Sequence, residues 1–301
     1  MPVDQAHLAA FTSLRPLLFS VAYRLLGRAC DAEDMVQEAW LRYSSRADDV
    51  DDPRSWLLQV VTRLSLDELR SARVRRERYL GPWLPEPVLT GELVVEDPLE
   101  AVERREVLSL GALAMLEHLS ESERAVFVLR EAMDLSHAEI ARLIGIAEPA
   151  SRQLLVRARR RLAAAPALAT PLAAAHHRLV DALIAAFQAG DVRSLGTLLR
   201  EDCVAITDGG GEALAARRPI HGRDRVLRLF AGLLAKASPE LRTAPAEVNG
   251  TPGFVTHAAD EPVQVGQLVL DEDGRIAELL FVVAPSKLAF VRRQRSCLGS
   301  A

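Results

Sequence analysis

The residues best suited to chemistry in this chain lie between positions 148 and 162, in the sequence E-P-A-S-R-Q-L-L-V-R-A-R-R-R-L. At about 100° per residue, one face of a helix over this segment carries Ser151, Leu155, Ala158 and Leu162. The opposite face carries Arg152, Gln153, Val156, Arg159 and Arg160. Arginine and glutamine can pair with the edges of guanine and adenine in the major groove. The segment therefore predicts a helix that reads DNA.

The preceding residues supply the rest of a DNA-binding motif. S-H-A-E-I-A-R-L-I-G, at positions 136–145, predicts a short helix that ends in a glycine turn. A short helix, a tight turn and a second helix with polar side chains form a helix-turn-helix. The alternative interpretation is a solvated arginine face on an ordinary surface helix.

Composition limits the class of protein. A chain of 301 residues with 49% hydrophobic residues suits two or three small domains. The sequence has no apolar run long enough for a membrane span and no signal-peptide pattern, which favours a cytoplasmic protein without membrane contact. Cys30, Cys203 and Cys297 are isolated, so we expect neither a disulfide framework nor a metal site. Nothing in the sequence indicates a cofactor.

The net charge of −4 averages over segments of opposite sign. Basic residues outnumber acidic ones at positions 54–80 and 152–161, whereas positions 86–106 hold seven carboxylates and two arginines. Phosphates respond to charge within a Debye length of roughly 10 Å. The overall charge is therefore compatible with nucleic-acid binding by the basic segments.

Helical periodicity predicts an all-α half over residues 5–165. The first helices are expected at 11–26, from an N-cap at 31–34, and from about residue 54. A Pro-rich, then acidic linker follows at 81–98, and further helices are expected at 99–117, 120–131, 136–144 and 148–162. A second linker, A-A-A-P-A-L-A-T-P, closes this half.

The remaining third predicts a small α+β domain. Helices are expected at 174–189, 191–199 and 223–235, and strands at 203–207 and near 253–257, 263–270 and 275–283. D-E-D-G at 271–274 is a hairpin-turn sequence. D-G-G-G at 208–211 predicts a tight turn after the first strand, and its glycines can take a positive φ and approach another backbone closely.

Two motifs of the helical half resemble bacterial sigma factors of the extracytoplasmic-function type. D-A-E-D-M-V-Q-E-A-W-L-R (31–42) resembles the helix of domain 2 that binds core RNA polymerase, and R-S-W-L-L-Q-V-V-T-R-L-S-L-D-E-L-R (54–70) resembles its promoter −10 helix. Residues 107–162 resemble domain 4, which reads the −35 element. W-L-P-E-P (83–87) and D-G-G-G point to the SigJ-like group, which carries a fused SnoaL-like domain.

The resemblance implies a multidomain fold: two all-α sigma domains and an α+β SnoaL-like cone. The implied boundaries are domain 2 at 1–80, a linker at 81–104, domain 4 at 105–165, a linker at 166–174, the SnoaL-like domain at 175–292 and a tail at 293–301. It also implies core RNA polymerase and promoter DNA as partners. The acidic linker would thread towards the polymerase active channel or serve as a tether.

The sequence departs from the family at a few positions. Ala147 and Arg63 stand where many relatives carry Ser or Thr and Asn. The group's D-G-G-G-K reads D-G-G-G-E here, with Glu212, and its N-P-D-K-L reads A-P-S-K-L at 284–288. Glu212 carries the opposite charge to the lysine of the group, which puts any electrostatic role of position 212 in doubt.

Each predicted function is assigned to a set of residues. For the −35 element these are Arg152, Gln153 and Arg159, with Arg157 and Arg160 on phosphates. For the −10 element, by resemblance, they are Trp56, Arg63, Arg70 and the loop 44–52; a core role is the alternative for Trp56. For core polymerase they are Asp34, Gln37, Glu38 and Leu41. For regulation between domains they are Trp83, Pro85, Pro87, Asp208, Gly209, Gly210 and Gly211.

The favoured function is a non-enzymatic sigma factor that the SnoaL-like domain modulates in cis, by docking or by a small-molecule ligand. One alternative is a SnoaL-like enzyme or ligand-sensing regulator with a DNA-binding N-terminal half, which would use acid–base residues among Asp208, His221, His257 and Asp260. A second alternative is an ordinary helix-turn-helix repressor, but this function would not account for the helices expected in residues 5–80.

Overall fold

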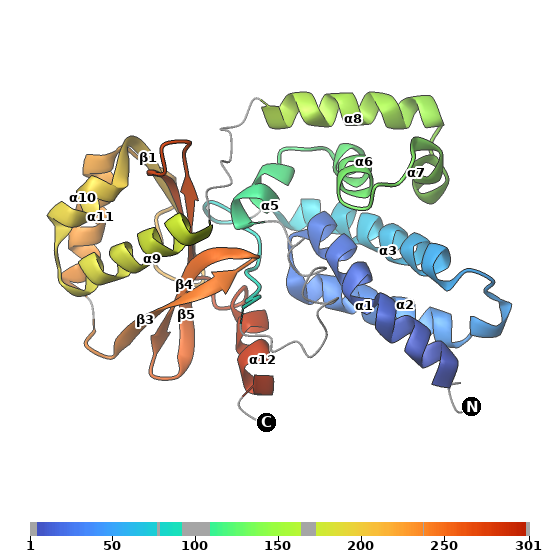
Figure 1. The fold of residues 1–301 in the computed structure, drawn as a ribbon, viewed down its shortest axis with the longest axis horizontal. Helices are drawn as coiled ribbons and strands as arrows, with labels where there is room; N and C mark the ends of the chain where they lie inside the picture. Colours follow the sequence, from blue (N-terminus) through green and yellow to red (C-terminus); the bar gives the residue numbers. More distant parts are fainter. Residues whose placement is uncertain (1–4, 77–78, 92–108, 164–172, 237, 299–301) are drawn as a thin grey trace. The chain divides into compact units, whose positions relative to one another are not determined.

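The computed structural model describes residues 5–76, 79–91, 109–163, 173–236 and 238–298. The chain divides into two compact units (Figure 1). The helical unit includes Met1–Arg78 and Met115–Pro166. The α+β unit includes Tyr79–Val94, Leu108–Ala114 and Ala167–Ala301. The predicted order, all-α domains followed by an α+β domain, is confirmed.

The first half of the helical unit consists of α1 (Gln5–Leu26), α2 (Ala29–Ser44), a short 3-10 turn η1 (Ala47–Asp49) and α3 (Pro53–Arg76). Helix α1 ends at Gly27, which has a φ of 67°. Helix α2 begins before Asp31, so Asp31 lies in the first turn and the predicted N-cap at 31–34 is wrong. Leu18, Val36 and Leu57 are fully buried between the three helices.

The second half of the helical unit consists of α6 (Glu121–Glu131), α7 (His137–Ile144) and α8 (Glu148–Ala163). Helices α6 and α7 each begin with a capping box, in which a serine and a glutamate three residues later satisfy one another's backbone N–H groups. Helix α7 ends at Gly145, whose φ of 74° turns the chain into α8. This arrangement is the predicted helix-turn-helix.

The two halves of the helical unit pack together: α6 lies on α1 and α3, and α7 lies on α3. Arg124 of α6 is 2% exposed in this contact. Its Nε donates to the carbonyl of Arg24 at 3.1 Å, and its Nη1 donates to Glu117 at 2.5 Å. Burial lowers the pKa of the Arg124 guanidinium to about 9, so it stays cationic at neutral pH.

The α+β unit is built on one six-stranded sheet with the order β2-β1-β6-β5-β4-β3. The strands are β1 (Leu199–Asp208), β2 (Ile220–His221), β3 (Leu241–Val248), β4 (Thr251–Ala258), β5 (Glu261–Leu270) and β6 (Ile276–Val282). Only the β1–β6 pairing is parallel among the described strands. Strands β2 and β3 were not predicted, because β2 has two residues and β3 is a polar edge strand with Pro245.

Three helices cover one face of this sheet: α9 (Ala173–Gln188), α10 (Val192–Leu198) and α11 (Arg223–Leu234) (Figure 1). Aromatic rings fill the space between helices and strands. Phe230 contacts Phe187 and Phe281 edge to face, with ring centroids 6.0 and 6.3 Å apart. Phe254 lies 6.2 Å from Phe281. The helix-covered face of the sheet is therefore a packed core in which these rings lie among aliphatic side chains.

The other face of the sheet is covered by residues 79–90, the start of α5 (Leu110–Leu116) and α12 (Ala289–Leu298). Leu84, Leu89 and Leu110 are buried there against Val248, Val265 and Val282. Two predicted boundaries are thus corrected: the linker predicted at 81–104 begins as part of the α+β unit, and the tail predicted from 293 continues α12. We call residues 79–90 the strap.

Candidate functional site

Helix α8 presents the predicted DNA-reading side chains to solvent. Ser151, Leu154, Leu155 and Ala158 are buried against the rest of the helix-turn-helix. The exposed face carries Arg152, Gln153, Val156, Arg157, Arg159 and Arg160. The Nδ1 of His137 lies 2.9 Å from the Oγ of Ser151 and joins α7 to α8. Helix α8 begins at Glu148 although Ala147 offers no side-chain cap.

Two of these arginines pair with exposed carboxylates of the same unit. Arg152 contacts Glu148 one turn earlier at 2.5 Å, and Arg159 contacts Glu131 of α6 at 2.7 Å. All four side chains are more than a third exposed. Exposed pairs of this kind contribute about 1 kcal/mol or less. DNA phosphates and bases can therefore compete for both guanidinium groups at small cost.

Glu123 is a positioning residue that the sequence analysis missed. Its side chain is 3% exposed and contacts Arg161 at 2.7 Å and Arg157 at 3.9 Å, both on α8. Burial opposes ionisation of Glu123, but hydrogen bonds from Ser120 and the charges of Arg161 and Arg157 outweigh it, so the pKa of Glu123 lies below its usual value. One carboxylate thus caps α6 and fixes α8.

Trp56 lies at the start of α3 beside a groove. Its ring is half-buried and 6.0 Å from the ring of Tyr43. The groove has a volume of about 420 Å³ and is lined by residues 49–52, Trp56 and Gln59 on one side and by Leu135, Glu139, Arg142 and Leu143 on the other. Trp56 is therefore partly core and partly groove wall. Arg63 and Arg70 are exposed further along α3 and do not line this groove.

The polymerase-facing surface predicted on α2 forms one exposed stripe. Asp34, Gln37 and Leu41 are exposed, and Leu41 is 63% exposed. Glu38 is partly buried and pairs with Arg42 at 2.8 Å. Val36, Ala39 and Tyr43 are buried on the opposite side of α2. A single exposed leucine among acids and an amide is ordinary on a protein surface, so the assignment of this stripe to core polymerase rests on the family resemblance.

Asp208, at the end of β1, is the centre of the strap's docking site. It is fully buried, and its carboxylate accepts four hydrogen bonds: from Tyr79 Oη at 2.5 Å, Leu84 N at 2.7 Å, Lys287 Nζ at 2.6 Å and Gly210 N at 3.1 Å. Two of the donors belong to the strap. A buried carboxylate is tolerated only with such compensation.

Lys287 completes the site from the other side. Its side chain is 4% exposed, and its Nζ donates to the carbonyl of Leu84 as well as to Asp208. The ammonium also lies over two strap rings, 4.1 Å from the centroid of Trp83 and 4.8 Å from that of Tyr79. Cation–π contacts strengthen when water is excluded. Lys287 belongs to A-P-S-K-L, and the sequence analysis assigned it no role.

The glycine run after Asp208 allows the strap to approach. Gly210 and Gly211 have φ values of 60° and 77°. A Cβ on Gly210 would stand 2.9 Å from the Tyr79 hydroxyl, and one on Gly211 would stand 2.9 Å from Leu80 Cδ1. The glycines thus approach Tyr79 and Leu80, which precede the predicted partner segment Trp83–Pro87 and belong with it to the α+β unit. Pro85 and Pro87 are buried.

The strap continues along the sheet through backbone hydrogen bonds. Val88 N donates to Asn249 Oδ1 at 3.0 Å, and its carbonyl accepts from Asn249 N at 2.8 Å. The side-chain amide of Gln294 on α12 bonds both the N–H and the carbonyl of Leu89, at 3.0 and 2.9 Å. Leu110 N donates to Gln267 at 2.8 Å. These contacts could not be predicted from the sequence, because a side chain that binds backbone atoms requires no particular residue type at its partner position.

The candidates for acid–base chemistry are dispersed over the α+β unit. Asp208 pairs with Lys287 rather than with a histidine. His221 is exposed on β2, His257 is half-buried on β4, and Asp260 is exposed in the β4–β5 turn. Within the described residues no group of three or more His, Cys, Asp or Glu side chains is placed to hold a metal ion.

A helix-turn-helix with an exposed, arginine-rich second helix, packed with a bundle of three helices, is the architecture expected of a sigma factor. The Sigma-70 region 2 family model matches residues 10–75, and the Sigma-70 region 4 model matches residues 109–162. The chain belongs to the extracytoplasmic-function (ECF) RNA polymerase sigma factors, which bind core polymerase and promoter DNA and direct transcription initiation. Among its described helices, none is long and apolar enough to cross a bilayer.

Relatives match along most of the chain. The ECF RNA polymerase sigma factor SigJ of Mycobacterium tuberculosis is 46% identical over 249 residues, which are 82% of this chain and 80% of SigJ. The probable ECF sigma factor SigI of the same species is 34% identical over 95% of this chain and 96% of its own length. A crystal structure of M. tuberculosis SigJ aligns with a TM-score of 0.76 and 37% identity, and covers 94% of this chain and 98% of that one.

Proposed function

We propose that the α+β unit controls this sigma factor in cis by holding the strap. The observation that carries the proposal is the convergence of four donors on the buried carboxylate of Asp208, two of them from the strap. The protein would act as a regulator rather than an enzyme, in the cytoplasm with RNA polymerase and without a cofactor.

The strap follows directly on α3, the helix assigned to the −10 element. In the sigma family this linker is expected to run towards the polymerase active channel. A strap fixed to the sheet by Asp208, Asn249 and Gln294 is withheld from that path. Docking therefore lowers transcription, and release of the strap raises it.

The same proposal assigns the remaining surfaces. Helix α8 reads the −35 element, Trp56, Arg63 and Arg70 serve the −10 element, and the α2 stripe binds core polymerase. The groove beside Trp56 is bordered by α7 when the helical unit is packed. Bases of the −10 element would reach Trp56 only after α7 moves away, so the packed form suits a resting state.

Run-off transcription with core polymerase tests the cis control. Asp208→Asn keeps the size of the side chain but removes the charge that binds Lys287, so strap amides such as that of Leu84 should exchange faster and transcription should rise several-fold. Asp202→Asn is the matched control, because Asp202 is exposed on the same strand and pairs only with Arg200 among the described residues. If Asp208→Asn frees the strap amides and transcription stays at the wild-type level, cis control through the strap is rejected.

A further inference from the structure

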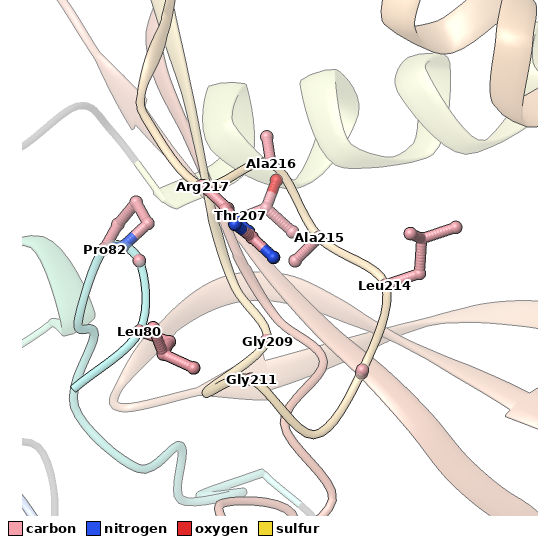
Figure 2. Close-up of a pocket in the computed structure, with 11 residues that line it drawn as sticks. Leu80, Pro82, Thr207, Gly209, Gly211, Leu214, Ala215, Ala216 and Arg217 are labelled. Carbon is pink, nitrogen blue, oxygen red and sulfur yellow. The ribbon is translucent and has the colours of Figure 1, made fainter. Parts of the chain in front are cut away.

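The strap and the loop after β1 border a small cavity within the α+β unit that is open to solvent on one side (Figure 2). Its volume is about 160 Å³. Leu80 and Pro82 of the strap form one wall, and Gly209, Gly211 and Ala215 of the loop form another. A SnoaL-like cone would hold its ligand in the space that the aromatic core fills here. The cavity lies outside that core.

Two polar side chains face this largely apolar space. Thr207, on β1, supplies a hydroxyl, and Arg217, at the end of the loop, supplies a guanidinium. Figure 2 shows the Arg217 side chain extending towards Thr207 and Ala215. Arg217 is exposed and lines the cavity, and like its neighbour Arg218 it has no ion pair among the described residues. A lone guanidinium beside a hydroxyl in an apolar pocket is suited to a carboxylate.

The size of the cavity limits the ligand. An apolar cavity of about 150 Å³ takes a molecule the size of benzene, which has six heavy atoms. A carboxylate of four or five carbons is of this size. We propose that the cavity between strap and loop is a binding site for a short-chain monocarboxylate, with its carboxylate on Arg217 and Thr207 and its alkyl chain against Leu80 and Pro82.

Such a ligand would touch the strap and the loop at once. Because it binds only when the strap is docked, it would stabilise the docked form by mass action. The site therefore deepens the proposed cis control, on which this consequence rests. Leu214, at the tip of the loop, borders the cavity but is 97% exposed, and in Figure 2 it lies apart from the other lining residues. An apolar side chain at that position is available to fold over the cavity mouth.

Binding is measured on the full chain by saturation-transfer NMR titration with butyrate. We expect saturable binding in the millimolar range, because so few atoms make contact. Butyramide has the same shape without the charge and should bind at least about tenfold more weakly, as should butyrate to Arg217→Gln. The neighbouring Arg218→Gln is the control, because Arg218 is exposed like Arg217 but does not line the cavity, and it should bind like the wild type.

Two results would overturn the site: no saturable binding of butyrate to the wild type, or equal binding by the wild type and Arg217→Gln. Ala215→Leu gives a second check, since it narrows the cavity without removing charge and should also weaken the binding of butyrate.

Failure of the cis control is distinguishable from failure of the site. If butyrate binds as expected but 20 times its dissociation constant leaves run-off transcription unchanged, the site stands and its regulatory consequence is wrong.

Discussion

The carboxylate of Glu212 accepts two hydrogen bonds from Ser286, one from its Oγ at 2.5 Å and one from its backbone N–H at 3.1 Å. The SigJ-like group has lysine and aspartate at these two positions, in D-G-G-G-K and N-P-D-K-L. The two departures of this chain therefore fall on one contact, a hydrogen-bonded pair that stands where the group's motifs have two opposite charges. The charge reversal at position 212 keeps the loop joined to A-P-S-K-L.

This relationship predicts the outcome of restoring the family's residues. Glu212→Lys alone loses both bonds and should destabilise the loop by about 1 kcal/mol. The double variant Glu212→Lys, Ser286→Asp should recover most of that loss through a new ion pair. Urea unfolding of the single and double variants measures the coupling, and Glu240→Lys, an exposed charge reversal elsewhere in the unit, is the control. Additive effects of the two substitutions would contradict the interpretation.

Gly211 should be required for strap docking and not only for its own turn. Gly211→Ala combines backbone strain with a Cβ 2.9 Å from Leu80, whereas Gly274→Ala, at a nearly identical φ of 76°, meets no atom within 4 Å. Strain of this kind costs about 1 kcal/mol or more at both sites. Only Gly211→Ala should speed hydrogen exchange of the Leu84 and Val88 amides. Equal exchange in the two variants would show that Leu80 adapts to the Cβ.

The sequence was sufficient for the parts of the fold with strong local signals. Helix α8 and its turn followed from 3.6-residue periodicity and Gly145, and the β5–β6 hairpin followed from Asp271–Gly274. The strap was predicted as a linker because Pro85 and Pro87 interrupt any periodicity. Its anchors include the side chains of Asn249 and Gln294, which bind backbone atoms 161 and 205 residues away. Contacts of that range leave no pattern in a single sequence.

The site residues divide in the same way. Arg152 and Arg159 were predicted from the face they share on one helix. Lys287 and Glu123 were missed, because a lysine near the C-terminus and a glutamate in a capping box are ordinary until the fold brings them to Asp208 and to Arg161. Glu123 did carry one signal, the serine three residues before it, but that signal indicates a helix start and not a contact with α8.

Acid should weaken the α+β unit through His176. This side chain is 5% exposed near the start of α9. Burial, with a smaller contribution from the charge of His177, lowers its pKa below the usual value, although a backbone hydrogen bond at Leu268 acts in the opposite sense. As the pH falls, His176 therefore binds a proton more readily in the unfolded chain than in the folded one. The contribution of neutral His176 to the free energy of unfolding is fully present above the pKa of the unfolded chain, about 6.5, and is lost as the pH falls towards the lower pKa of the folded state.

Thermal unfolding between pH 7.5 and 5.5 tests this linkage. We expect the wild type to lose stability over this range and His176→Gln to lose less, because glutamine does not titrate. His177→Gln is the control, since His177 is exposed and its replacement should change the slope little. If His176→Gln and the wild type show the same dependence on pH, another group causes the acid sensitivity.

Arg152 and Arg160 should contribute to promoter binding in different ways. Arg152 is placed to read a base edge once it leaves Glu148, so Arg152→Ala should cost about 1–3 kcal/mol at the preferred −35 sequence and relax the preference at one position. Arg160 is assigned to a phosphate, so Arg160→Ala should weaken all sequences alike and reduce the salt dependence of binding. Holoenzyme footprinting and binding to a set of single-base promoter variants at several salt concentrations separate the two effects. Arg193→Ala, an exposed arginine on α10, controls for loss of charge alone. An unchanged base preference with Arg152→Ala would remove Arg152 from the −35 contact and leave Gln153 and Arg159 as the readers on α8.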